Sequence, residues 1–112
     1  MQLAKAITKY VRIPPRKARY AADLIRGLSV AQATLQLKYC QLKGGRLILK
    51  TLDSAVANAE TQLNARRDDL KVVEVRVDPG PILRRAKPRS KGSSVPVNKR
   101  SSHFTVVVAT EG

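Results

Sequence analysis

A basic segment without acids interrupts the last third of this chain. Residues 81–100 contain seven Lys or Arg, three Pro, one Gly and three Ser, and no Asp or Glu. A segment with so much like charge and so few large apolar side chains cannot bury a core. It lies between two valine-rich stretches, 70–78 and 101–109, in which apolar and polar residues alternate as in half-buried strands. The simplest fold pairs these stretches in antiparallel fashion and turns the segment into a long hairpin.

This predicted hairpin spans about residues 79–100. Ten residues in each arm, at roughly 3.3 Å per residue, would project about 30 Å from the sheet. A short turn would join the two strands equally well, so a merely solvated loop is the weaker interpretation. Arginine and lysine along an extended chain neutralise phosphates, which indicates a nucleic-acid ligand. The candidate phosphate ligands are Arg84, Arg85, Lys87, Arg89, Lys91, Lys99 and Arg100.

The net charge of +14 is unevenly distributed along the chain. Residues 1–20 carry six basic residues and no acid, whereas residues 21–80 carry nine basic and seven acidic ones. A nearly neutral middle between two basic segments predicts two surfaces for a polyanion. A membrane surface is a poor alternative, because no predicted helix combines a basic face with large apolar residues.

The length of 112 residues, 43% of them hydrophobic, suffices for one modest core. We therefore expect a single nucleic-acid-binding domain over residues 1–112, including the protruding hairpin at about 79–100. The predicted fold class is α+β: three helices packed on a small antiparallel three-stranded sheet, with the long β-hairpin as an extension. Periodicity and capping signals predict an edge strand over 2–11 and helices over about 15–26, 30–39 and 46–63.

The first predicted helix begins at Pro15 and ends before Gly27, and its core face consists of Ala18, Ala21, Ala22 and Ile25. Its first turn carries Arg16, Lys17 and Arg19, which oppose the helix dipole and call for a negative partner.

Two further expectations concern the start of the second helix and the exposed and buried faces of one strand. Ser29 and Gln32 fit a capping box for the second helix. In the strand 70–78 we expect Val73, Val75 and Val77 on one face.

Catalysis, metal binding and a cofactor are not predicted. His103 is the single histidine and Cys40 the single cysteine, so the chain lacks a nucleophile with a neighbouring base and lacks a zinc-ligand cluster. We expect no enzyme activity, and we expect the chain to act in the compartment where it is made. Tyr20 and Phe104 are expected at the core, and no aromatic pair falls on a predicted strand as a base-stacking platform.

Several motifs together resemble one known family. They are Ala22-Asp-Leu-Ile-Arg-Gly27, Ser54-Ala-Val-Ala-Asn-Ala-Glu60, Val77-Asp-Pro-Gly-Pro81, Lys87-Pro-Arg-Ser-Lys-Gly92 and Lys99-Arg-Ser-Ser-His-Phe-Thr-Val-Val-Val108. In this order, over essentially the whole chain, they closely resemble the bacterial-type large-subunit ribosomal protein L22 family.

The resemblance implies a structural constituent of the large ribosomal subunit. Such a protein binds and staples 23S-type rRNA during assembly, and its hairpin lines the nascent-peptide exit tunnel. The implied partners are rRNA, neighbouring large-subunit proteins and the nascent peptide, with no membrane, and the free protein would be a monomer. The implied location is the cytoplasm of a bacterium or the stroma of a plastid.

The predicted site residues combine the charge pattern with this resemblance. The tunnel-lining tip is expected at Arg89, Ser90, Lys91 and Gly92. The predicted rRNA-binding residues are Arg12, Arg16, Lys17, Arg19, Arg84, Arg85, Lys87, Arg89, Lys91, Lys99 and Arg100.

The alternative function is an architectural DNA-binding protein with a basic β-arm. In that case Pro88 or Pro96 would wedge between base steps in a minor groove. This alternative predicts a stable dimer that prefers bent duplex DNA, whereas the ribosomal hypothesis predicts a monomer that prefers folded RNA.

Overall fold

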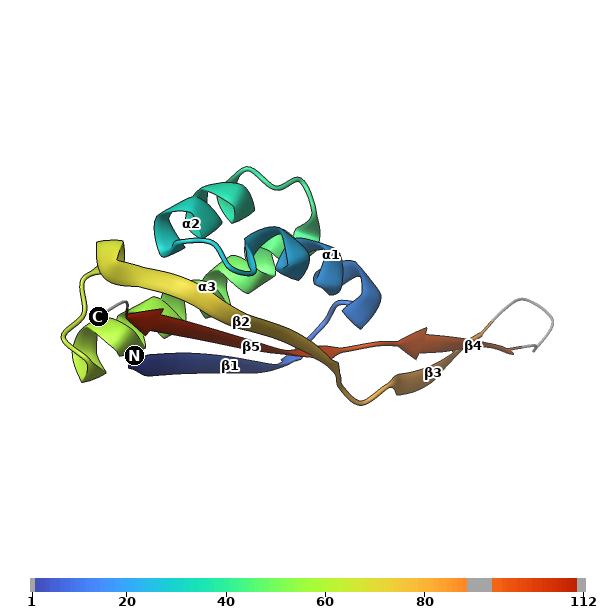
Figure 1. The fold of residues 1–112 in the computed structure, drawn as a ribbon. Coiled ribbons are helices and arrows are strands. Elements are labelled where there is room, and N and C mark those ends of the chain that lie inside the picture. Colours follow the sequence, from blue (N-terminus) through green and yellow to red (C-terminus); the bar gives the residue numbers. More distant parts are fainter. Residues whose placement is uncertain (1, 89–93, 111–112) are drawn as a thin grey trace.

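A computed structural model of the chain describes the backbone of residues 2–88 and 94–110 and the side chains of residues 2–82 and 100–110. Three helices lie over one face of an antiparallel sheet (Figure 1), which confirms the predicted α+β class. The elements in chain order are β1 (Leu3–Val11), α1 (Pro15–Ile25), α2 (Val30–Lys38), α3 (Lys43–Gln62), the 3₁₀ turn η1 (Arg67–Asp69), β2 (Leu70–Pro79), β3 (Leu83–Pro88), β4 (Ser94–Lys99) and β5 (Ser102–Thr110).

The three helices and the three-stranded sheet β1-β5-β2 form the body of the protein. In this sheet β5 pairs antiparallel with both neighbours. β1 is therefore an edge strand, as its lysines predicted. Pairing of β2 with β5 leaves β3 and β4 as a separate two-stranded hairpin, in which Leu83 is opposite Lys99 and Pro88 is opposite Ser94. This hairpin extends away from the body in Figure 1 and accounts for the elongated dimensions of 65 × 25 × 16 Å.

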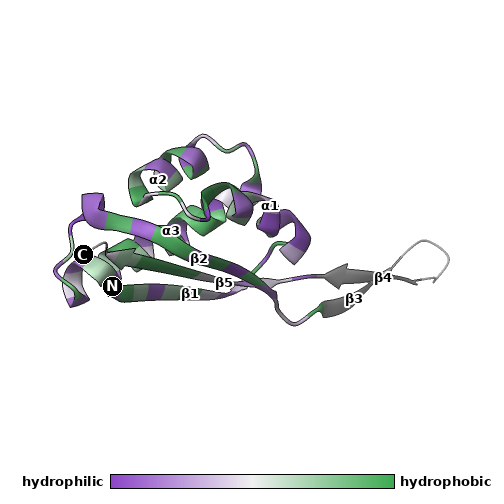
Figure 2. Cartoon of the chain, in the orientation of Figure 1, coloured by the Kyte–Doolittle hydropathy of each residue, from purple (hydrophilic) through white to green (hydrophobic). Residues whose placement is uncertain are grey.

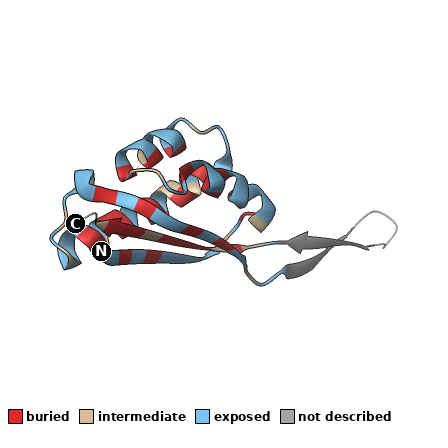
Figure 3. Ribbon diagram, in the orientation of Figure 1, coloured by how far each residue is buried: buried red, intermediate tan, exposed pale blue. Residues whose placement is uncertain are grey.

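The core lies between the helices and the sheet (Figure 3). The three alanines and Ile25 predicted for the core face of α1 are fully buried, and so are Ile48 and Leu52 of α3. Phe104 on the central strand is also fully buried, as expected. Tyr20 was also expected at the core, but this residue is 57% exposed, because it lies on the opposite face of α1 from the alanines. None of the helices described is long and apolar enough to cross a membrane.

The buried face of β2 differs from the prediction. Val75 and Val77 are buried, but Val73 is exposed and Val72 is buried in its place. The pairing with β5 shifts register between Val72 and Glu74. Such a β-bulge inserts one residue and reverses the alternation of side chains, which regular alternation in the sequence cannot reveal.

The ends of the helices follow the predicted signals, with one exception. α1 is followed by Gly27 at φ +85°, and the Ser29 hydroxyl accepts a hydrogen bond from the Gln32 N–H at 3.3 Å at the start of α2. α3 begins at Lys43, earlier than the predicted Arg46, so that Gly44 and Gly45 lie within the helix.

Close packing explains these helical glycines. A Cβ atom at Gly44 would lie 3.2 Å from the Cα of Ala18, and one at Gly45 would lie 2.9 Å from the Cβ of Cys40. Gly44 therefore allows the start of α3 to approach α1 closely, and Gly45 allows it to approach the segment that follows α2. This close packing outweighs the low helix propensity of both glycines.

Candidate nucleic-acid interface

A basic groove of about 530 Å³ lies where the first turns of α1 and α3 meet. Three cationic side chains line it: Arg12 from the end of β1, Lys17 from α1 and Lys43 from α3. Tyr20 and Leu42 supply an apolar wall. Figure 2 shows hydrophilic residues gathered at this start of α1. Among the described residues that line the groove, none is acidic.

The charge of this α1–α3 groove is not neutralised within the described part of the chain. The ion pairs found there lie elsewhere, between Arg26 and Asp23, Arg67 and Asp53, and Arg76 and Glu74. The first turns of α1 and α3 also contain no acid. Cations at the positive ends of two helix dipoles repel one another and the dipoles, so an anionic ligand would stabilise this surface.

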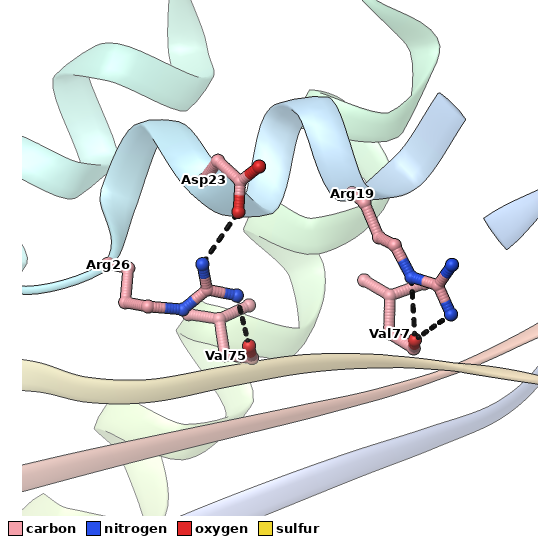
Figure 4. A network of polar contacts seen from close by, with 5 residues as sticks. All are labelled: Arg19, Asp23, Arg26, Val75 and Val77. Carbon is pink, nitrogen blue, oxygen red and sulfur yellow. Dashed lines mark hydrogen bonds and ion pairs between the residues drawn. The ribbon is translucent and has the colours of Figure 1, made fainter. Parts of the chain in front are cut away.

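Arg19, one of the predicted rRNA-binding residues, is directed toward the sheet instead (Figure 4). Its Nε and Nη2 atoms donate to the Val77 carbonyl at 3.3 and 3.2 Å. Two turns further along, just after the end of α1, the Nη2 atom of Arg26 donates to the Val75 carbonyl at 2.7 Å, while its Nη1 atom contacts Asp23 at 2.6 Å. These bonds cover carbonyls along the free edge of β2. An rRNA contact from Arg19 stays a prediction.

Comparison with known proteins decides the family. The family model of ribosomal protein L22p/L17e matches residues 6–109. The chain belongs to this family. It is 69% identical over 109 residues to large ribosomal subunit protein uL22 of Protochlamydia amoebophila, covering 97% of this chain and 98% of that protein. It is 56% identical over 104 residues to uL22 of Chlamydia abortus, covering 93% of this chain and 94% of the relative.

The hairpin of this L22-family chain carries most of the other predicted contacts. Arg84, Arg85 and Lys87 occupy β3, and Lys99 ends β4. Arg100 is exposed just before β5. The pairing places Arg84 opposite Asn98, Arg85 opposite Val97 and Lys87 opposite Val95, so these basic residues share one hairpin. The predicted tip, Arg89 to Gly92, lies outside the described residues.

The fold brings together basic residues that are distant in sequence. Arg12, Arg16 and Lys17 are exposed, as a phosphate-binding role requires. Lys43 joins Arg12 and Lys17 in the groove, and Arg46 is exposed nearby in the first turn of α3.

Lys43 and Arg46 were not among the predicted binding residues, and the predicted helix began only after the glycine pair, at Arg46. A glycine pair at the start of a strongly periodic helix can instead indicate close helix packing. That signal would have placed Lys43 on the same helix as Arg46.

Proposed function

We propose that this L22-family protein is a structural constituent of the large ribosomal subunit that binds rRNA and holds RNA segments together during assembly. Membership of the L22p/L17e family, over residues 6–109, is the observation that carries the proposal. The relatives at 69% and 56% identity are named as large ribosomal subunit proteins. The α1–α3 groove and the hairpin supply two separate basic surfaces for this role.

Binding is mainly electrostatic in this proposal. Lysine and arginine that contact phosphates release counterions from the RNA, and this release favours association. Such contacts fix the position of the protein on the RNA and carry little sequence information. Shape recognition of folded RNA then supplies specificity, because two surfaces of a fixed body can be contacted only by suitably spaced RNA segments.

The finer parts of the proposal follow the family resemblance. The hairpin would pass between rRNA segments and line the nascent-peptide exit tunnel, with Arg89 to Gly92 at its tip. The free protein would be a monomer, and neighbouring large-subunit proteins would complete its surroundings. The proposed location is the ribosome of a bacterial cytoplasm, in keeping with the chlamydial relatives. This role requires no catalysis, metal or cofactor.

Binding assays with two nucleic acids test the proposal against the DNA-binding alternative. The protein is titrated with transcribed large-subunit rRNA and with duplex DNA of intrinsically bent sequence, and its mass is measured by sedimentation. We expect a monomer that binds the rRNA more tightly at every salt concentration. A stable dimer with a preference for the duplex would contradict the ribosomal role.

A further inference from the structure

Tyr10 has an unusual backbone conformation at the root of the hairpin, the place where β2 ends and β5 begins. It lies in β1 at φ +60°, in the left-handed region that bulky residues rarely adopt. The pairing of β1 with β5 is irregular between Thr8 and Val11, so Lys9 and Tyr10 together face the position of His103. Glycine is the favoured residue for such a conformation, and a tyrosine there is strained.

Core packing does not explain this strain. The Tyr10 side chain is 66% exposed, so its ring buries little apolar surface in the folded protein. Strained residues held in place by their surroundings concentrate at binding sites. An exposed ring on a strained backbone therefore indicates a contact made outside the chain.

His103 holds this ring in place. The Tyr10 N–H donates to Nδ1 of His103 at 3.1 Å, and the two rings meet edge to face with centroids 5.0 Å apart. Gly80 lies close to the imidazole, since a Cβ atom at its position would lie 3.2 Å from Cε1 of His103. The sequence did not predict this aromatic pair, because a histidine and a tyrosine 93 positions apart meet only through the strand register.

The charges around the ring suit a nucleic acid. Lys9 precedes Tyr10 in β1 and Arg12 follows just after the strand, and both residues are exposed. Arg100, also exposed, lies just before β5 at the same root. Asp78 of β2 is paired with His103 in the sheet and is the acid nearest in register. An aromatic face among cations accommodates a base with its neighbouring phosphates.

We propose that Tyr10 stacks on an unpaired rRNA base at the root of the hairpin, with His103 as the residue that positions its ring. This inference rests on the proposed rRNA binding and deepens it, since it adds a stacking contact to the electrostatic ones. A base stacked at the root would fix the position from which the hairpin extends.

Substitution by glycine separates the backbone strain from the ring. Tyr10→Gly relieves the left-handed strain, so we expect the thermal midpoint of unfolding not to fall. Affinity for transcribed large-subunit rRNA should fall about tenfold, the loss expected for one base stack. Tyr10→Phe keeps the aromatic face and should bind within about twofold of the wild type. Tyr39→Ala, which removes a 74% exposed tyrosine on another surface, is the matched control and should leave affinity unchanged.

The outcomes distinguish this inference from the proposed function. Wild-type affinity in Tyr10→Gly overturns the stacking contact and leaves rRNA binding standing. A parallel loss of stability and affinity in Tyr10→Gly also overturns it, because the ring would then be structural. Failure of the wild-type protein to bind rRNA overturns both.

Tyrosine emission offers an independent test, since the chain has no Trp and three Tyr. With Tyr20 and Tyr39 replaced by Phe, all emission comes from Tyr10. We expect rRNA to lower the Tyr10 emission by more than it lowers the emission of a free tyrosine derivative in a solution of the same absorbance. Unchanged emission, or a photocrosslink from Tyr10 to a neighbouring protein in assembled subunits, would contradict stacking on RNA.

Discussion

The α1–α3 groove and the hairpin are both basic, but they are built differently. The groove is formed by helices packed on a buried core, with Gly44 against Ala18 fixing their approach. The strands of the hairpin pair only with each other in a separate two-stranded sheet. An isolated two-stranded hairpin is marginally stable in water. The groove is thus a preformed anchor, whereas the hairpin gains much of its stabilisation from the RNA around it.

Removal of the hairpin should have the largest effect on binding. In the variant, residues 83–99 are replaced by Asn-Gly, which joins Ile82 to Arg100 by a tight turn. The body should still unfold cooperatively, because the described core lies between the three helices and the three-stranded sheet, which the variant retains. The slope of log affinity against log salt should become shallower by roughly 4 to 5, since six basic residues are lost. Filter binding over a salt series measures this slope, and loss of cooperative unfolding would show that the hairpin supports the core.

A cavity in the core should destabilise the anchor most strongly. Leu52→Ala removes a fully buried side chain of α3, so we expect the free energy of unfolding to fall by about 2–5 kcal/mol. Denaturant titration measures this change. Leu35→Ala, at an exposed position of α2, serves as the control and should change stability little. Equal effects of both variants would contradict the core as described.

Crowding at the helix contact should disturb the groove specifically. Gly44→Val inserts atoms beside the Ala18 backbone, so we expect a loss of about 1–3 kcal/mol in the free energy of unfolding. Affinity for rRNA should fall as well, because Lys43 would move relative to Lys17. Ala57→Val, at an exposed position of the same helix, is the matched control. If Gly44→Val were as stable as that control, the close approach would be refuted.

Neutralising one cation of the groove should have a smaller effect. Lys43→Gln should leave thermal stability unchanged and make the salt slope shallower by roughly 0.7 to 0.9, as for one phosphate contact. Lys50→Gln, on the same helix but outside the groove, should leave the slope unchanged. Equal slopes for the two variants would remove the groove from the interface.

The smallest expected effect on RNA binding comes from replacing Arg26, an arginine that is hydrogen-bonded within the body. Arg26→Gln removes the hydrogen bond to the Val75 carbonyl and the contact with Asp23, so we expect a loss of about 0.5–1.5 kcal/mol in stability. The salt slope should not change. A shallower slope with unchanged stability would instead assign Arg26 to the RNA interface.

Local signals in the sequence predicted much of the fold. Gly27 ends α1, Ser29 caps α2 and the small residues of α1 form its core face, because each depends on chemistry within a few positions. The bulge beside Val73 and the exposure of Tyr20 depend on how strands and helices meet, which no local pattern records.

The same distinction applies to the candidate site. Charge runs predicted the hairpin residues and Lys17. Lys43 could not be assigned without the contact between α1 and α3, and Tyr10 could not be paired with His103 without the strand register.

Crosslinking from both basic surfaces in assembled large subunits tests the account most directly. A photoreactive group is placed at position 43 in the groove and, in a second variant, at position 87 in the hairpin, and the crosslinked nucleotides are mapped. Because the two surfaces belong to different parts of the fold, we predict crosslinks to two separate segments of the rRNA. Crosslinks from both positions to one peripheral RNA helix would contradict a protein that holds RNA segments together.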